Sequence, residues 1–263
     1  MRVVGMTAAA LLLVTGTAWA QGYKPLKKCA LDAVIAGTVC MDKYEASVWE
    51  VPNPTTTNRG LVIKIQQGKA TAALLTAAGA VQRGVAGDDY GASCADDGYN
   101  CLQSDALYAV SLPGVMPSSR MTWFQASAFC ANSRKRLPTN GEWQVAALDH
   151  GGFADADCNI SSGARAATGA YGACISEAGA YDTTGNVAEW VADWVPRSTA
   201  CPEWGSFTND RMCLSGADTT APGPGALLRG GHFSFGSLAG PLSVFSDLVP
   251  STSSPGFGFR CVR

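Results

Sequence analysis

Ten cysteines lie between residues 29 and 261 of this 263-residue chain, and they constrain its fold more than any other feature. An even number of cysteines in an exported chain is typical of a disulfide framework, because oxidising compartments preserve such bonds. The spacing favours four local pairs and leaves two distant cysteines for a fifth, although spacing alone leaves the connectivity open. The favoured pairs are Cys29 with Cys40, Cys94 with Cys101, Cys158 with Cys174, and Cys201 with Cys213, and the remaining two are Cys130 and Cys261.

A metal cluster is the alternative use of so many cysteines, and the sequence gives it little support. No Cys-x-x-Cys spacing occurs, and only His150 and His232 offer imidazole ligands. We therefore expect the cysteines to form disulfides.

The N-terminus has the three parts of a secretory signal peptide. Arg2 supplies the positive charge, "TAAALLLVTGT" (7–17) is the apolar run, and "AWA" (18–20) is a small-x-small cleavage site. The run is too short to cross a bilayer, which argues against a transmembrane anchor. We predict a signal peptide at 1–20, one mature domain at 21–263, and a secreted or periplasmic protein with no membrane span after cleavage.

Charge and composition exclude two classes of partner. The net charge is −2, and neither a basic stripe nor an acidic tail is present. Nucleic acid and anionic membrane surfaces are therefore not expected as partners. The 30 glycines favour many turns over long helices, and the length is sufficient for a substantial core.

Two capping boxes predict the starts of two helices. Thr122 with Gln125 opens the first, in "TWFQASAFCANSRKR", and Thr139 with Glu142 opens the second, in "LPTNGEWQVAA". Apolar residues recur at helical spacing in both segments, so each helix should bury one face.

Elsewhere the local pattern is weaker. Residues 39–51 are rich in β-formers and predict one strand, and the alanine-rich stretch 68–84 predicts a short helix. From residue 158 onward glycines recur and long periodic runs are missing, so turns and short strands should dominate.

The stretch "AYDTTGNVAEWVADW" (180–194) has two competing interpretations. Its tryptophans, Trp190 and Trp194, are spaced like one face of a helix, and five oxygen-bearing side chains precede them. It is either a polar turn that caps a buried helix or a loop that holds a hard cation. Calcium takes six to eight oxygen ligands, and a loop that leads into a helix offers both carboxylates and carbonyls.

Five stretches, in this order along the chain, resemble the sulfatase-modifying-factor family, whose unit is the formylglycine-generating-enzyme-like domain. Residues 52–112 match no part of that pattern and are predicted to be an insertion. The matching stretches are "MDKYEAS" (41–47), "MTWFQASAFCANSRKRLPTNGEWQVAA" (121–147), "TGNVAEWVADW" (184–194), "LLRGGHF" (227–233) and "GFRCVR" (258–263).

The resemblance implies a fold and a disulfide. The fold is α+β, related to C-type lectins, with little regular secondary structure, disulfide staples and frequent bound calcium. The resemblance also implies that the cysteine of the first helix pairs with the cysteine of the terminal "GFRC", which is Cys130 with Cys261.

The resemblance further implies a structural calcium site in the loop before Trp190. Its ligands would be the side chains of Asp182 and Glu189 and the carbonyls of Gly185 and Val187. The alternative is that Asp182 and Asn186 cap the turn and Glu189 pairs with an arginine. A second calcium site of the family would involve Asn159 and Ile160.

The resemblance also raises the question of copper chemistry. The resemblance implies an oxidase that binds copper through two cysteines between the "RGG" strand and the terminal "GFRC". That segment here, residues 234–258, contains no cysteine, so neither copper nor a catalytic residue is predicted.

The leading hypothesis is thus an exported, calcium-stabilised binding module with a peptide, protein or glycan ligand. One alternative is a formylglycine-generating-type oxidoreductase that acts on protein cysteine through a displaced pair, Cys158 with Cys174 or Cys201 with Cys213, or another enzyme chemistry on the same fold. A structural protein of the cell surface is the third.

Overall fold

The computed structural model describes residues 28–91, 94–101, 106–148, 157–216, 218, 221 and 223–263. The predicted signal peptide at 1–20 lies outside these residues. No described helix has the length and apolarity that crossing a bilayer requires.

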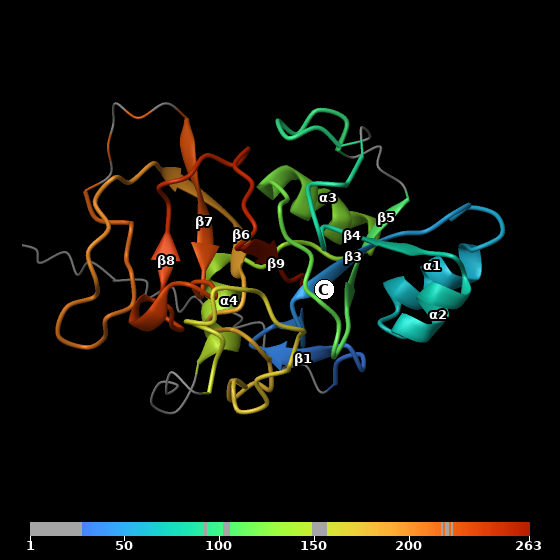
Figure 1. Cartoon of the computed structure of the whole chain (residues 1–263), viewed down its shortest axis with the longest axis horizontal. Helices are drawn as coiled ribbons and strands as arrows, with labels where there is room; N and C mark the ends of the chain where they lie inside the picture. Colours follow the sequence, from blue (N-terminus) through green and yellow to red (C-terminus); the bar gives the residue numbers. More distant parts are fainter. Residues whose placement is uncertain are drawn as a thin grey trace, which may run out of the picture.

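Short helices and strands are joined by long loops (Figure 1). The helices are α1 (Arg59–Gln66), α2 (Ala72–Ala77), α3 (Trp123–Asn132), α4 (Asn140–Ala147) and the 3-10 turn η2 (Gly236–Leu238). The strands are β1 (Ala33–Ala36), β2 (Val39–Asp42), β3 (Ala46–Glu50), β4 (Val81–Arg83), β5 (Leu107–Ser111), β6 (Ala188–Pro196), β7 (Pro224–Arg229), β8 (Val244–Phe245) and β9 (Phe257–Phe259). The predicted α+β class with little regular structure is confirmed.

Three small sheets organise the strands. β1 and β2 form a hairpin, and β3 lies between β4 and β5 in an antiparallel sheet. The third sheet has the order β8-β7-β6-β9, in which β9 runs parallel to β6. This pairing places Glu189 opposite Gly258, so the loop before β6 lies beside the C-terminal residues.

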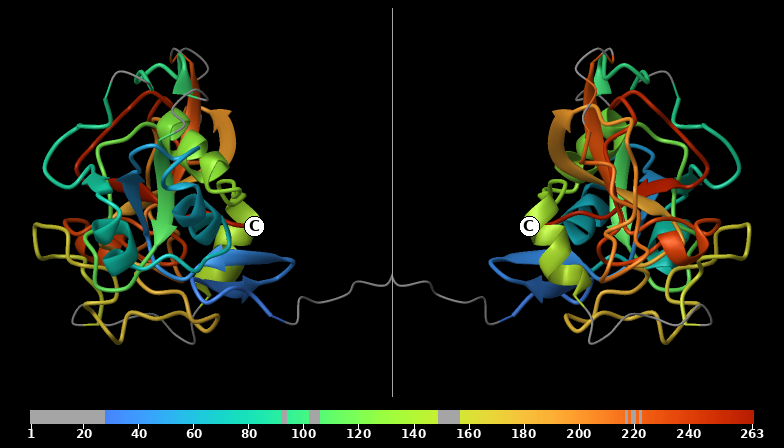
Figure 2. Two further views of the ribbon diagram at one scale, coloured as in Figure 1. Left: turned by 90° about the vertical axis from the view of Figure 1, so that its right-hand side faces the viewer. Right: turned by 90° about the vertical axis from the view of Figure 1, so that its left-hand side faces the viewer.

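Both predicted capping boxes are present and begin α3 and α4. α3 buries Phe129 and Cys130 in the main core, which also contains Trp190 of β6. Burying one such large apolar side chain contributes about 1.5–3 kcal/mol. α4 buries Trp143 in a second cluster with the β1–β2 hairpin, which projects beside it (Figure 2).

Residues 52–112, the predicted insertion, contain α1, α2, β4 and β5. The two helices stand at one edge of the molecule (Figure 1) and bury Leu61, Ile65 and Leu75 against Tyr108 and Val110 of β5. β5 itself pairs along its whole length with β3. The segment is thus a side lobe attached to the body through a shared sheet.

The short helix predicted within 68–84 is present as α2. Two other local predictions were wrong. The strand at 39–51 is two strands, and 188–196 is a strand where helical spacing was inferred. A four-residue spacing is even, so it also fits one face of a strand. A bulge between Trp190 and Trp194 then separates their environments, and Trp194 is 42% exposed whereas Trp190 is fully buried.

The disulfide predictions are confirmed, because all ten cysteines are paired as the spacing and the resemblance indicated. Cys130–Cys261 ties α3 to the last residues of the chain across a sequence separation of 131. The other four bonds close local loops.

Candidate functional site

Glu189 lies at the centre of a buried ionic cluster. Nε and Nη2 of Arg260 donate to its two carboxylate oxygens, both at 2.6 Å, and the indole Nε1 of Trp143 donates to Oε2 at 2.7 Å. All three side chains are buried. The pairing of Glu189 with an arginine is the alternative that the sequence left open, and it engages both carboxylate oxygens.

A second buried carboxylate, that of Glu45, accepts hydrogen bonds from the loop that precedes Glu189. Its Oε1 accepts the backbone N–H of Val187 at 2.9 Å, and its Oε2 accepts the side-chain amide of Asn186 at 2.5 Å. Burial raises the pKa of Glu45 well above its usual range, and the charges of Asp182 and Glu189 raise it further. Three buried carboxylates, those of Glu45, Asp182 and Glu189, therefore act electrostatically on the guanidinium of Arg260, and Glu189 is the one that bonds it.

Asp182 begins the turn that leads to β6. Its backbone has φ +57°, and its Oδ2 accepts the N–H of Gly169 at 2.7 Å. Burial raises the pKa of Asp182 to about 6, against the opposing effects of the Gly169 N–H and Arg260. The next two residues, Thr183 and Thr184, have buried hydroxyls without a hydrogen-bond partner, a state that an unseen water or ion commonly explains.

The residues of the two predicted calcium sites lie together. The side chain of Asn159 donates to Asn186 Oδ1 at 2.9 Å, and the N–H of Asn186 donates to the Asn159 carbonyl at 2.8 Å. Gly185, at φ +77°, has no space for a side chain, because a Cβ there would collide with the Asn159 carbonyl and with Ile160. The two loops that contain these residues are therefore direct neighbours.

Two neighbouring pockets open beside this cluster, and because Tyr44 and Pro113 line both, we refer to the two together as the groove. Its larger part has a volume of about 490 Å³ and its smaller part about 250 Å³. The larger part is otherwise lined by Leu31, Asp32, Lys43, Gly68, Lys69, Ala70, Thr71, Ala72, Ala73, Ser111 and Leu112. The smaller part is otherwise lined by Gly114, Ala167, Thr168, Gly169, Ala170, Gly172 and Tyr181.

Tyr44 and Tyr181 are stacked in the groove. Their ring centroids are 5.1 Å apart with an interplanar angle of 17°. The ammonium of Lys43 lies 5.8 Å and 5.5 Å from the two ring centroids. Each tyrosine immediately precedes a buried carboxylate, Glu45 or Asp182, so each of these two segments contributes both to the groove and to the ionic cluster.

The sequence did not predict the groove or two members of the cluster. Glu45 and Arg260 both lie in stretches that carried the resemblance, and a charged residue inside an apolar strand pattern was the available signal. Tyr44 had no such signal, because its neighbour Tyr181 comes from a distant part of the chain.

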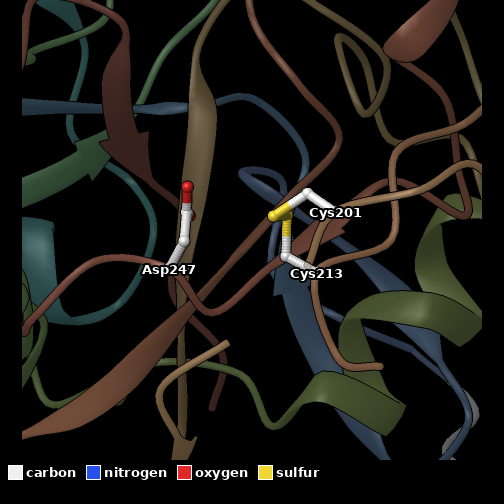
Figure 3. Close-up of side chains that lie close together, drawn as sticks. All are labelled: Cys201, Cys213 and Asp247. Atoms are coloured by element: carbon white, nitrogen blue, oxygen red, sulfur yellow. A yellow bond between two sulfur atoms is a disulfide. The ribbon is translucent and has the colours of Figure 1, made fainter. Parts of the chain in front are cut away.

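One other group of side chains has ligand atoms close together. Among the described residues, Cys201, Cys213 and Asp247 are the only set of three His, Cys, Asp or Glu residues whose ligand atoms lie within 4.8 Å of one another (Figure 3). The two cysteines form a disulfide, whose sulfurs are not the thiolates that bind soft metals. This group is therefore not a metal site while the bond is intact.

Comparisons with known proteins agree with the resemblance. The chain is 29% identical over 179 residues to the formylglycine-generating enzyme of Streptomyces coelicolor, covering 56% of this chain and 52% of the enzyme. It is 28% identical over 171 residues to the serine/threonine-protein kinase pkn1 of Chlamydia caviae, covering 56% of this chain and 24% of the kinase. The chain thus matches about half or less of the length of these curated relatives.

Similar solved structures include PvdO from Pseudomonas aeruginosa, at 14% identity and a TM-score of 0.43, covering 88% of this chain and 82% of that one. The Major Tropism Determinant P3c variant has 20% identity and a TM-score of 0.40, covering 61% and 46%. The model of the sulfatase-modifying factor enzyme 1-like domain matches residues 37–263. The chain therefore belongs to the family of sulfatase-modifying factor enzyme 1-like domains.

Proposed function

We propose that this chain is an exported binding module of its family, stabilised by calcium and without copper-oxidase chemistry. The observation that carries the proposal is the state of the cysteines. All ten are in disulfides, and the segment in which the resemblance expects a copper-binding pair, 234–258, contains none. A soft-metal oxidase of the expected kind requires a pair of thiolates, which this arrangement does not offer.

The groove beside Tyr44 is the surface that supports a binding role. Its larger part, of about 490 Å³, has the size range of ligand pockets, is mostly apolar, and contains a few polar groups. Many of its lining residues come from the lobe at 52–112 and from the loop at 167–172, and the others include Lys43, Tyr44 and Tyr181. Loops held on a rigid, disulfide-linked frame are where binding residues concentrate.

The state of the thiols tests the oxidase alternative. We expect intact-mass spectrometry of the mature protein, alkylated under denaturing and non-reducing conditions, to find no alkylated cysteine. Alkylation after reduction, which should label all ten cysteines, is the control. Two alkylated cysteines in the unreduced protein, above all Cys201 and Cys213 beside Asp247, would favour the oxidoreductase that the Streptomyces relative suggests.

Calcium is proposed for the loop from Asp182 to Glu189. The Asp182 carboxylate and the carbonyls of Gly185 and Val187 would hold the ion, and the unpartnered hydroxyls of Thr183 and Thr184 are further oxygen donors in that loop. Both carboxylate oxygens of Glu189 accept hydrogen bonds from Arg260, so Glu189 would contribute negative charge near the ion. A divalent cation would offset the excess of carboxylates over guanidinium groups.

Calcium removal should destabilise the protein. At a calcium concentration 100 times Kd, binding stabilises by about 2.7 kcal/mol, which raises Tm by about 5–10 °C for a domain of this size. Thermal melts with calcium and with a chelator measure the difference. Asp182→Asn should abolish it, whereas Asp97→Asn, in an exposed loop, should retain it. An equal calcium response in wild type and Asp182→Asn would place the ion elsewhere, and no response would refute the proposal.

A further inference from the structure

The disulfide between Cys201 and Cys213 is only partly covered by the rest of the protein. Cys201 is half-buried, whereas Cys213 is completely buried. Thiol–disulfide exchange requires an external thiolate to reach one sulfur of the bond. In three other disulfides both cysteines are buried, namely Cys94–Cys101, Cys130–Cys261 and Cys158–Cys174. The fifth, Cys29–Cys40, again has one half-buried cysteine, Cys29, and it serves below as the reference bond.

A carboxylate distinguishes Cys201–Cys213 from the reference bond. A carboxylate oxygen of Asp247 lies within 4.8 Å of both sulfurs of Cys201–Cys213 (Figure 3). In the part of the chain that the structure describes, no carboxylate or imidazole has such a place beside the reference bond. Oδ1 of Asp247 is buried and has no hydrogen-bond partner. The carboxylate thus lies beside two sulfurs that, in a disulfide, have no hydrogen to donate.

Reduction of the bond would supply that donor. It converts the two sulfurs to S–H groups, and one of them is able to donate to a buried oxygen that is otherwise unsatisfied. The hydrogen bond would stabilise the reduced form, and a disulfide whose reduced form is stabilised is easier to reduce. Loop entropy does not separate this bond from the reference bond, because their sequence separations are 12 and 11.

The loop between the two cysteines is also closed by contacts other than the disulfide. The N–H of Met212 donates to the carbonyl of Pro202 at 2.7 Å, and each of these residues is the chain neighbour of one of the cysteines. The hydroxyl of Ser198 donates to the carbonyl of Ser215 at 2.9 Å, outside the cysteines on both sides. These contacts would keep the two thiols close together after reduction, so that the bond can form again.

We propose that Cys201–Cys213 is a redox-active disulfide that exchanges with a low-molecular-weight thiol, while the other four bonds are structural. A thiolate of the small molecule attacks Sγ of Cys201, the bond between the two protein sulfurs breaks, and Sγ of Cys213 leaves with the electron pair and takes a proton from water. A second small thiolate attacks the small-molecule sulfur of the mixed disulfide and releases Cys201, which is also protonated. Two small thiols are thereby oxidised to one disulfide, and the protein disulfide is reduced to two thiols.

Equilibration in glutathione redox buffers compares the two accessible bonds within one sample. The folded mature protein is held at pH 7, where ordinary thiols are mostly protonated, at a series of ratios of reduced to oxidised glutathione. After an acid quench and alkylation, peptide mapping gives the reduced fraction of each disulfide. We expect the equilibrium constant for reduction of Cys201–Cys213 to exceed that of the reference bond at least about 10-fold, a difference of about 30 mV. The three buried bonds should stay oxidised.

A variant tests the role assigned to the carboxylate. Asp247→Ala should make Cys201–Cys213 about 10-fold harder to reduce and should leave the reference bond unchanged within twofold. Glu203→Ala is the matched control, because Glu203 is an exposed acid in the same loop, and it should change neither bond more than twofold. A thermal melt of each variant shows whether it is folded, and the comparison of the two bonds in wild type needs no variant.

The inference fails if the two accessible bonds are equally reducible, if Cys201–Cys213 stays oxidised throughout the series, or if folded Asp247→Ala keeps the wild-type constant. None of these results bears on the proposed binding role, because the resting protein has the bond closed in either case. The thiol count in the unreduced protein tests that role separately.

Discussion

Replacing Arg260 with methionine should lower the free energy of unfolding by about 3–5 kcal/mol, the cost of leaving a buried charge without its partner. Arg260 is completely buried and holds both oxygens of Glu189, while its Nη2 and Nη1 also donate to the carbonyls of Tyr181 and Asp42. Without the guanidinium, three buried carboxylates would face one another. Domains of this kind have only about 5–15 kcal/mol of stability in total.

An exposed arginine–glutamate pair that also has two hydrogen bonds is the control. Arg136 makes two hydrogen bonds to the carboxylate of Glu142, both at 2.7 Å, but its side chain is 52% exposed. Arg136→Met should therefore cost less than about 1 kcal/mol. Urea unfolding measures both variants. Equal losses would show that burial is not what makes the Arg260 pair matter, and a tolerated Arg260→Met would mean that the carboxylates become protonated.

The predictable parts of this fold are those determined by neighbours in sequence. A capping box needs only Thr122 and Gln125, three residues apart, and it correctly marks the start of α3. Four of the five disulfides close short loops and followed from spacing. The fifth, Cys130–Cys261, followed from what remained and from the family resemblance.

The site depends on partners that lie far apart in the chain. Glu189 meets Arg260 at a separation of 71 residues, and Glu45 meets Asn186 at 141. No local pattern encodes such pairs. The sequence therefore indicated oxygen ligands in the loop, but it did not indicate which of these oxygens accept hydrogen bonds from an arginine. The sequence also did not predict that β6 is a strand. Its run Ala188–Val191 is buried on both faces, so it shows no alternation of apolar and polar residues.

Removing the disulfide between Cys130 and Cys261 should be the most costly covalent change. The bond spans 131 residues, and the entropy of the loop it closes corresponds to about 5 kcal/mol in the chain-entropy model. Both cysteines are fully buried, so Cys130→Ala with Cys261→Ala also loses packing in the main core. We expect the double variant to unfold at a Tm far below wild type, or to fail to accumulate in folded form.

The matched control is Cys94→Ala with Cys101→Ala, which opens a loop with a separation of only 7 and should cost about 2 kcal/mol on the same account. Chemical unfolding in oxidising buffer compares the two. Cys261 follows Arg260 directly, so the long bond also holds the guanidinium against Glu189, and its loss should remove part of the effect of Arg260→Met in a combined variant. Full additivity of the two changes would mean that the end of β9 stays in place without the bond, and equal losses for the long and the short loop would contradict the entropic account.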